Sequence, residues 1–305
     1  MPLLTKKHTM RWQGRKKSSN VEDRRGSSGG GAGRGGKMGI IGTVLVVIFA
    51  LIIGKNPGDL LQMVGAFSGG GGAAAQVENT RGPVETGNEA EDELAEFVSV
   101  VLQDTEDVWS DLFPKYYNKA YQKPALVLYS GSTYSGCGTA KAATGPFYCP
   151  ADQKLYIDLS FYRELKTRFK APGDFAMAYI VAHEVAHHVQ FLLGITAQVD
   201  RLRGKVSKAQ YNDKSVRLEL MADFLAGVWA HHAQRTKNIL QEGDLEEAIR
   251  AASSVGDDRI QMEAQGYVVP ESFTHGTSEQ RTRWFAKGLK TGDVRQGDTF
   301  SANPL

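Results

Sequence analysis

The motif HExxH at residues 183–187 lies within a strongly apolar stretch, and it constrains the fold more than any other segment. The apolar residues around it predict a buried helix that ends near Gly194. Two histidines four residues apart share one face of a helix, so His183 and His187 can bind one metal ion. Burying these side chains together with Glu184 would be costly without a partner. We therefore expect a metal site inside a folded domain.

A catalytic zinc site has three protein ligands and keeps a fourth position open. We expect Glu219, in a second apolar helix over about residues 214–235, to be the third ligand. Asp223, one turn later, would accept a hydrogen bond from a ligand histidine and fix its tautomer. A solvated acidic face is the alternative, but apolar residues surround both acids. The same helix carries three small residues that would let it approach the HExxH helix closely: Ala222, Ala226 and Gly227.

The longer motif HExxHxxGxxH is absent, because Gln190 and Leu193 stand where its glycine and third histidine would be. The residue after the motif, His188, projects about 140° away from His183 around the helix, which makes it a poor ligand. We expect the remaining helical histidines to be non-ligands that are exposed or hydrogen-bonded: His188, His231 and His232.

The rest of the domain, residues 94–300, reads as several helices and a few strands, which is typical of the α+β class. Asp174 is expected to cap the HExxH helix, and Thr277 and Gln280 fit a capping box for the last helix. The other expected elements are a helix from Leu94 to near Pro114, strands at 125–129 and 155–159, and a helix over about 245–265.

The first third of the chain has a different composition. Residues 1–37 are rich in glycine and serine and carry a net charge of +8, whereas the whole chain carries +2. Such a segment is expected to be a disordered basic tail. Residues 38–54 contain no charge, and a helix of that length, roughly 25 Å, can span a membrane. Residues 55–93, with four consecutive glycines, are expected to form a flexible linker.

The charge bias predicts a cytoplasmic N-terminus, a single membrane span and a domain on the outer side of the cytoplasmic membrane. In that oxidising compartment a disulfide between Cys137 and Cys149 is favoured, with two free buried thiols as the alternative. The expected partners are membrane lipid, through the span, and no nucleic acid, because the chain is not uniformly basic.

These features resemble a known group of enzymes. HExxH followed by ExxxD on a second helix looks like the gluzincin class of zinc peptidases. More narrowly, residues 95–300 resemble the bacterial neutral zinc metallopeptidase family of membrane-anchored predicted metalloproteases, notably in GPFYCP at 145–150, ELMADFLAG at 219–227 and THGTSEQR at 274–281. The resemblance implies a zincin-like domain behind one transmembrane helix in the bacterial inner membrane. It also implies one zinc ion and peptidase activity on a protein or peptide substrate.

In the mechanism that we expect, zinc activates a water molecule and Glu184 acts as the general base of an endopeptidase. His275 is the leading candidate for stabilising the oxyanion, followed by Tyr148 and Tyr211. The edge of the strand near Leu159 is a candidate for binding an extended peptide.

Two other functions remain open at this point. One is a non-catalytic, zinc-stabilised binding or chaperone module at the membrane surface. The other is a membrane scaffold whose basic tail binds anionic lipid or nucleic acid.

Overall fold

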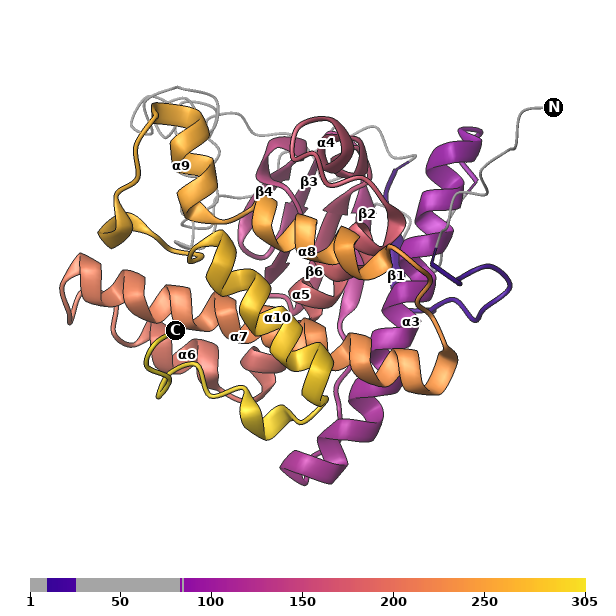
Figure 1. Ribbon diagram of the computed structural model, residues 1–305. Helices are drawn as coiled ribbons and strands as arrows, with labels where there is room; N and C mark the ends of the chain where they lie inside the picture. Colours follow the sequence, from indigo (N-terminus) through magenta and orange to yellow (C-terminus); the bar gives the residue numbers. More distant parts are fainter. Residues whose placement is uncertain (1–9, 26–82, 84) are drawn as a thin grey trace.

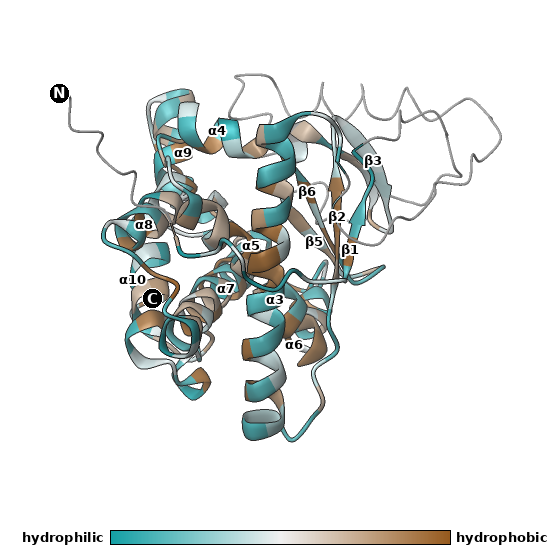
Figure 2. Cartoon of the chain, turned by 90° about the vertical axis from the view of Figure 1, so that its right-hand side faces the viewer, coloured by the Kyte–Doolittle hydropathy of each residue, from teal (hydrophilic) through white to brown (hydrophobic). Residues whose placement is uncertain are grey.

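The computed structural model describes residues 10–25, 83 and 85–305, which form an α+β fold with one larger and one smaller sheet. In Figure 2 the strands stand on one side of the molecule and most helices gather on the other. The strands are β1 (Val21–Asp23), β2 (Ala125–Tyr129), β3 (Ser132–Ser135), β4 (Gly138–Lys141), β5 (Phe147–Cys149) and β6 (Lys154–Asp158). The α-helices are α3 (Glu89–Tyr117), α4 (Phe161–Thr167), α5 (Asp174–Leu192), α6 (Ile195–Asp200), α7 (Lys208–Lys237), α8 (Asp244–Ser254), α9 (Asp257–Gln265) and α10 (Ser278–Thr291).

The larger sheet has the order β1-β2-β6-β5, in which only β5 runs antiparallel to its neighbour. Successive side chains of a strand point to opposite faces. Leu155 and Ile157 of β6 therefore enter the main core with the helices, whereas Tyr156 enters a smaller core on the opposite face. The alternation expected for this strand is confirmed, and both faces of the sheet are covered.

Residues 10–25 belong to the folded domain, so the expectation of a disordered tail over residues 1–37 is wrong for this part. β1 pairs in parallel with β2, with Val21 opposite Leu126. Met10 and Trp12 are buried in the main core, where the ring of Trp12 lies 5.6 Å from that of Phe97. The apolar surface that these few residues bury stabilises an ordered conformation despite the polar composition.

The expected membrane span at 38–54 and most of the expected linker over 55–93 lie outside the described residues. The end of that linker is wrong, because residues 89–93 form the start of α3. Among the described residues, no helix combines the length and the apolar character that crossing a membrane requires.

The helices around the metal motif are packed closely. α7 contacts both α5 and α10, and α10 crosses in front of it in Figure 1. A Cβ atom on Gly227 would lie 2.1 Å from the backbone oxygen of Phe285, and one on Gly288 would lie 2.0 Å from that of Phe224. Gly227 thus permits the close approach of α7 to α10, rather than to the HExxH helix α5 as expected.

Three expected helix boundaries differ from the structure. α3 continues through Pro114, and packing of Phe113 against Tyr117 and Tyr121 holds its last turn, with ring distances of 5.2 and 5.0 Å. α7 begins earlier than expected, at a capping box formed by Ser207 and Gln210. The helix expected over 245–265 is two helices, α8 and α9.

The expected cap of α5 is also wrong. Asp174 is the first helical residue and makes no capping hydrogen bond. The backbone N–H of Phe175 instead donates a hydrogen bond to the Glu247 carboxylate of α8, at 3.1 Å. At the start of α10, by contrast, the capping box of Thr277 and Gln280 is confirmed.

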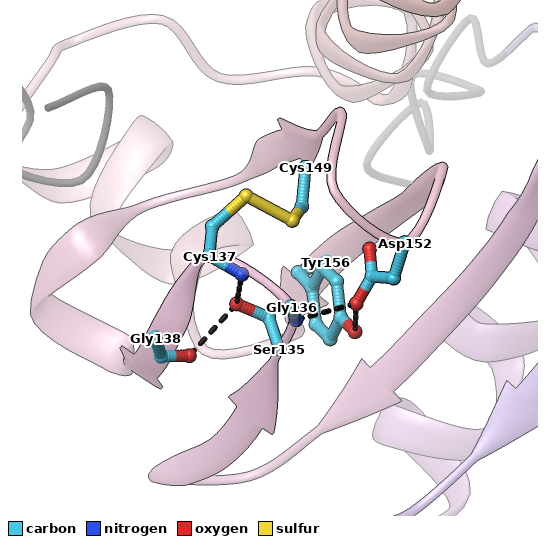
Figure 3. The surroundings of a disulfide bond; sticks show 7 residues. All are labelled: Ser135, Gly136, Cys137, Gly138, Cys149, Asp152 and Tyr156. Atoms are coloured by element: carbon cyan, nitrogen blue, oxygen red, sulfur yellow. Dashed lines mark hydrogen bonds between the residues drawn. A yellow bond between two sulfur atoms is a disulfide. The ribbon is translucent and has the colours of Figure 1, made fainter. Parts of the chain in front are cut away.

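The expected disulfide is present. Cys137, at the turn between β3 and β4, is bonded to Cys149 of β5, as Figure 3 shows. The N–H of Cys137 donates to Ser135, and the N–H of Gly136 donates to Asp152, so the turn is also held by hydrogen bonds. The disulfide joins the small hairpin to β5, the strand of the larger sheet that contacts α5.

Candidate metal centre

Two helices bring together the three expected metal ligands. His183 and His187 project from α5, and their Nε2 atoms lie 3.2 Å apart. Glu219 of α7 places one carboxylate oxygen 3.2 Å from Nε2 of His183 and the other 3.5 Å from Nε2 of His187. The three side chains form a candidate metal-binding group. The structure therefore brings together the three side chains that the sequence spacing predicted to meet.

The other ring nitrogen of each histidine is already bonded. Nδ1 of His183 lies 2.9 Å from Asp223, and Nδ1 of His187 lies 2.9 Å from the side-chain oxygen of Gln190. Gln190 is oriented by its own amide, which donates to the backbone oxygen of Leu218 at 2.7 Å. Both Nδ1 atoms therefore carry the proton, and the Nε2 atoms are left to face the metal position.

The donor atoms have the spacing that a zinc ion requires. Tetrahedral zinc with bonds of about 2.0–2.1 Å separates its ligand atoms by roughly 3.3 Å, close to the distances observed here. Three electron-pair donors at this separation repel one another unless a cation lies among them. A proton can bridge only one pair at a time, whereas a metal ion can bind all three. We conclude that these residues fit a zinc ion.

The charge state of His183 follows from its neighbours. Burial favours the neutral ring, but the carboxylates of Asp223 and Glu219 outweigh burial and raise the pKa of His183 to about 9. Burial likewise opposes the charged form of Glu219, yet the histidines around it hold its pKa well below the usual range. The site is therefore built to hold positive charge next to an anionic carboxylate. A metal ion that binds there displaces a proton.

Asp223 is the centre of a buried network behind the ligands. Its carboxylate accepts hydrogen bonds from the Tyr179 hydroxyl and, at 2.8 and 3.0 Å, from the guanidinium of Arg281. Burial alone would raise the pKa of Asp223, but Arg281 and His183 reverse this effect and lower it. Arg281 comes from α10, and it also donates to the backbone oxygen of Val255 where α8 ends. The break between α8 and α9 thus helps to orient the metal site.

Glu184 is largely buried, with 9% of its surface exposed. Burial raises the pKa of Glu184, although His187 and His183 oppose the shift. It lines the same cavity as the candidate ligands, and the backbone of Tyr148 in β5 also favours its charged form. A carboxylate with a raised pKa beside a metal position suits a group that accepts and then returns a proton.

His275 lies in the loop before α10 and lines the same cavity. Its Nδ1 lies 3.3 Å from Asp257, whose other oxygen accepts the backbone N–H groups of Thr274, His275 and Gly276. Burial lowers the pKa of His275, but the carboxylates of Glu219 and Asp257 outweigh it and raise that pKa. The structure therefore brings His275 to the site, as the sequence predicted.

The two tyrosines named as weaker candidates already make other hydrogen bonds. His188 donates from Nε2 to the backbone oxygen of Gln122 at 2.6 Å, and its Nδ1 accepts from the Tyr148 hydroxyl at 3.0 Å. The hydroxyl of Tyr211 accepts from Arg203 at 2.7 Å. Burial lowers the pKa of His188 to about 4, so its ring is neutral. Because both ring nitrogens are already hydrogen-bonded, His188 is a core residue rather than a ligand.

The other two helical histidines are non-ligands as well. His231 and His232 bond the backbone oxygens of Leu289 and Gly292, at 2.8 Å each. They join α7 to the end of α10.

A cavity of about 250 Å³ opens over the candidate ligands. The Nε2 side of the histidines, Glu184 and His275 all lie on its wall, together with Arg281. Much of the remaining wall is apolar, and it includes Phe147, Phe161, Phe169, Ile180, Val199 and Leu218.

The α+β fold, the HExxH helix and the candidate carboxylate ligand from a second helix are consistent with a zincin-like metal site. Comparison with known proteins agrees with this class. The chain belongs to the family described as "putative neutral zinc metallopeptidase", whose sequence profile matches residues 10–300. The match includes residues 10–25, so the N-terminal segment that packs in the fold is also part of the family's sequence.

The chain is similar to bacterial proteins that are themselves described as uncharacterized. It is 48% identical over 298 residues to the protein YpfJ of Escherichia coli K12. The aligned region covers 95% of this chain and 99% of YpfJ. It is 42% identical over 208 residues to the protein Rv2575 of Mycobacterium tuberculosis H37Rv. Here the aligned region covers 65% of this chain and 68% of Rv2575. No solved structure matches the chain.

Proposed function

We propose that this chain is a zinc-dependent endopeptidase. The observation that carries the proposal is the convergence of two histidine Nε2 atoms and the Glu219 carboxylate at tetrahedral spacing, with Glu184 on the wall of the same cavity. When bound, zinc would polarise the substrate carbonyl and lower the pKa of a water molecule towards about 7.

The protein's own residues would then move the proton. As the water oxygen bonds to the carbonyl carbon, the Glu184 carboxylate takes a proton from it. The same proton passes to the amide nitrogen when the C–N bond breaks, which leaves a free acid and a free amine. His275, whose Nδ1 lies 3.3 Å from Asp257, would donate from its other nitrogen to the oxygen that gains negative charge.

The substrate class follows from the apolar part of the cavity. Ile180 precedes Glu184 by one helical turn and lies on the same side of α5. Phe147, from β5, and Phe161, from the start of α4, line the same cavity. We propose that this end of the cavity binds a large apolar side chain next to the bond that is cleaved.

Membrane association is a further part of the proposal, and only the sequence of residues 38–54 supports it. The disulfide between Cys137 and Cys149 supports a location outside the cytoplasm, because such bonds persist in oxidising compartments.

Metal removal tests the proposed activity. We expect the purified protein to cleave an unfolded protein substrate, to lose this activity on chelation and to regain it with one equivalent of zinc per chain. A protein that binds one zinc ion but cleaves nothing would instead be the non-catalytic binding module.

A further inference from the structure

The N-terminal segment, residues 10–25, packs against the rest of the domain through backbone hydrogen bonds and buried side chains. We propose that this segment and residues 85–305 occupy one cellular compartment. The chain between them then crosses a membrane an even number of times, zero included. This inference does not depend on the proposed peptidase activity, and it revises the expected single-pass topology.

Backbone hydrogen bonds attach the segment along its whole length. The N–H of Arg11 donates to Ile239, that of Ser18 to Ser99 and that of Arg24 to Leu128, at 2.8–3.0 Å. These acceptors come from three separate parts of the domain. The segment is therefore bound to the assembled fold rather than to one neighbouring strand.

Buried polar contacts make the attachment specific. Glu106 in α3 has a side chain that is 1% exposed. It accepts hydrogen bonds from Ser18 at 2.5 Å and from Asn20 at 2.8 Å. Asp104, two residues before it in the same helix, pairs with Arg15. Without the segment, these acidic groups would lose partners that compensate their burial.

The same contacts explain why the charge bias is a poor guide to topology here. The expectation of a cytoplasmic N-terminus counted the basic residues of a free tail. In the structure Arg15 pairs with Asp104, Lys17 with Glu96 and Arg25 with Asp92. These positive charges are bound to acidic groups of the domain and are not free to hold the segment on one side of a membrane.

The two ends of the undescribed region also meet at one place. Arg25, the last described residue before it, donates to the backbone oxygen of Glu91 at 3.1 Å and to Asp92 at 3.0 Å, in the first turn of α3. A chain that leaves the domain at Arg25 and returns at α3 begins and ends on the same side. One crossing by residues 38–54 would pull these contacts apart.

Cysteine labelling in the full-length chain tests the proposal. Ser19 in the segment and Ser110 in α3 are both exposed, and the two native cysteines are bonded to each other. The variants Ser19→Cys and Ser110→Cys are expressed separately in a bacterium. A membrane-impermeant maleimide is then added to intact spheroplasts and, in a parallel sample, to spheroplasts lysed with detergent. We expect the two positions to behave alike, either both labelled or both protected until lysis. Labelling of one position and protection of the other would overturn the proposal, whether or not the chain has peptidase activity.

A cross-link shows whether the docking occurs within one chain. Lys17 and Glu96 form a partly exposed ion pair at 2.5 Å. In the double variant Lys17→Cys/Glu96→Cys, a short bis-maleimide should yield a cross-linked monomer. Covalent dimers in its place would show that the segment docks on a second copy, and they would remove the argument for a shared compartment.

Discussion

The side-chain oxygen of Gln190 lies 2.9 Å from Nδ1 of His187, and this contact fixes how the ring presents Nε2 to the candidate metal position. The corresponding contact of His183 is made by a carboxylate, that of Asp223. One ligand histidine is therefore oriented by a neutral group and the other by a charged one.

Loss of the neutral partner should weaken zinc binding without abolishing it. We expect Gln190→Ala to lower zinc affinity about 10- to 100-fold, which is the usual effect of removing a group that orients a ligand. The measurement is a competition titration with a chromophoric chelator. Gln198→Ala is the control, because Gln198 is exposed on α6 and should leave the affinity unchanged. An unchanged affinity in the Gln190 variant would contradict the assignment.

The buried guanidinium of Arg281 should act on zinc through Asp223. Arg281→Met keeps much of the side chain's length but removes the charge, which leaves the Asp223 carboxylate buried without its main cation. We expect zinc affinity to fall at least tenfold and the melting temperature to fall as well. Arg283→Met, in the same helix but exposed, should change neither quantity. A variant that is only less stable, with unaltered zinc affinity, would show that Arg281 is purely structural.

The apolar end of the cavity should set the cleavage preference. Wild type is expected to favour peptides with a large apolar residue next to the cleaved bond. Ile180→Phe fills part of this space and should lower the ratio of kcat/KM for leucine over alanine peptides by roughly tenfold or more. Val199→Ile changes the cavity wall at another position and is the comparison. Cleavage without any apolar preference in wild type would refute the subsite but not the peptidase activity.

A carboxyl group far from the metal should make stability depend on pH. Burial and the nearby Asp174 raise the pKa of Glu247 to about 7, compared with 4.5 for an ordinary glutamate. Between these values the folded state holds a proton that the unfolded state has lost, so stability falls as the pH rises. Glu247→Gln resembles the protonated form. It should melt a few degrees above wild type above pH 7, with the difference vanishing near pH 4.5. A constant difference across this range would contradict the account.

The N-terminal segment should contribute to the stability of the whole domain. Trp12 is 8% exposed and packs against Phe97, so Trp12→Ala should cost about 3–5 kcal/mol of unfolding free energy. Gln13→Ala, at the exposed neighbouring position, should cost little. Urea denaturation checks both values. Equal stability of the two variants would mean that the segment is not held in the fold.

The parts of the site that could be predicted from the sequence are those with local spacing. His183, Glu184 and His187 are fixed relative to one another by the turn of one helix. Glu219 and Asp223 are likewise four residues apart and lie on one face of a second helix. The α+β class was predicted separately, from the several helices and few strands expected over residues 94–300.

The missed contacts depend on how distant elements pack. Arg281 reaches Asp223 only because α10 lies against α7, at Gly227 and Gly288. Gln190 carried a signal that could have been used, since it follows His187 by three residues and so lies on the same side of α5. In the N-terminal segment the signal was Trp12, a large apolar residue in polar surroundings. Its significance becomes clear only once Phe97 is known to lie beside it.

The central claim is tested most directly by comparing wild type with Glu184→Gln, each shown to hold one zinc ion per chain. An unfolded protein substrate and mass-spectrometric detection of the products suit a peptidase of unknown specificity. We predict that wild type cleaves the substrate and that the variant retains its zinc but is slower by about 10²–10⁴-fold. Equal cleavage by the two proteins, or cleavage by neither at full zinc occupancy, would contradict the account.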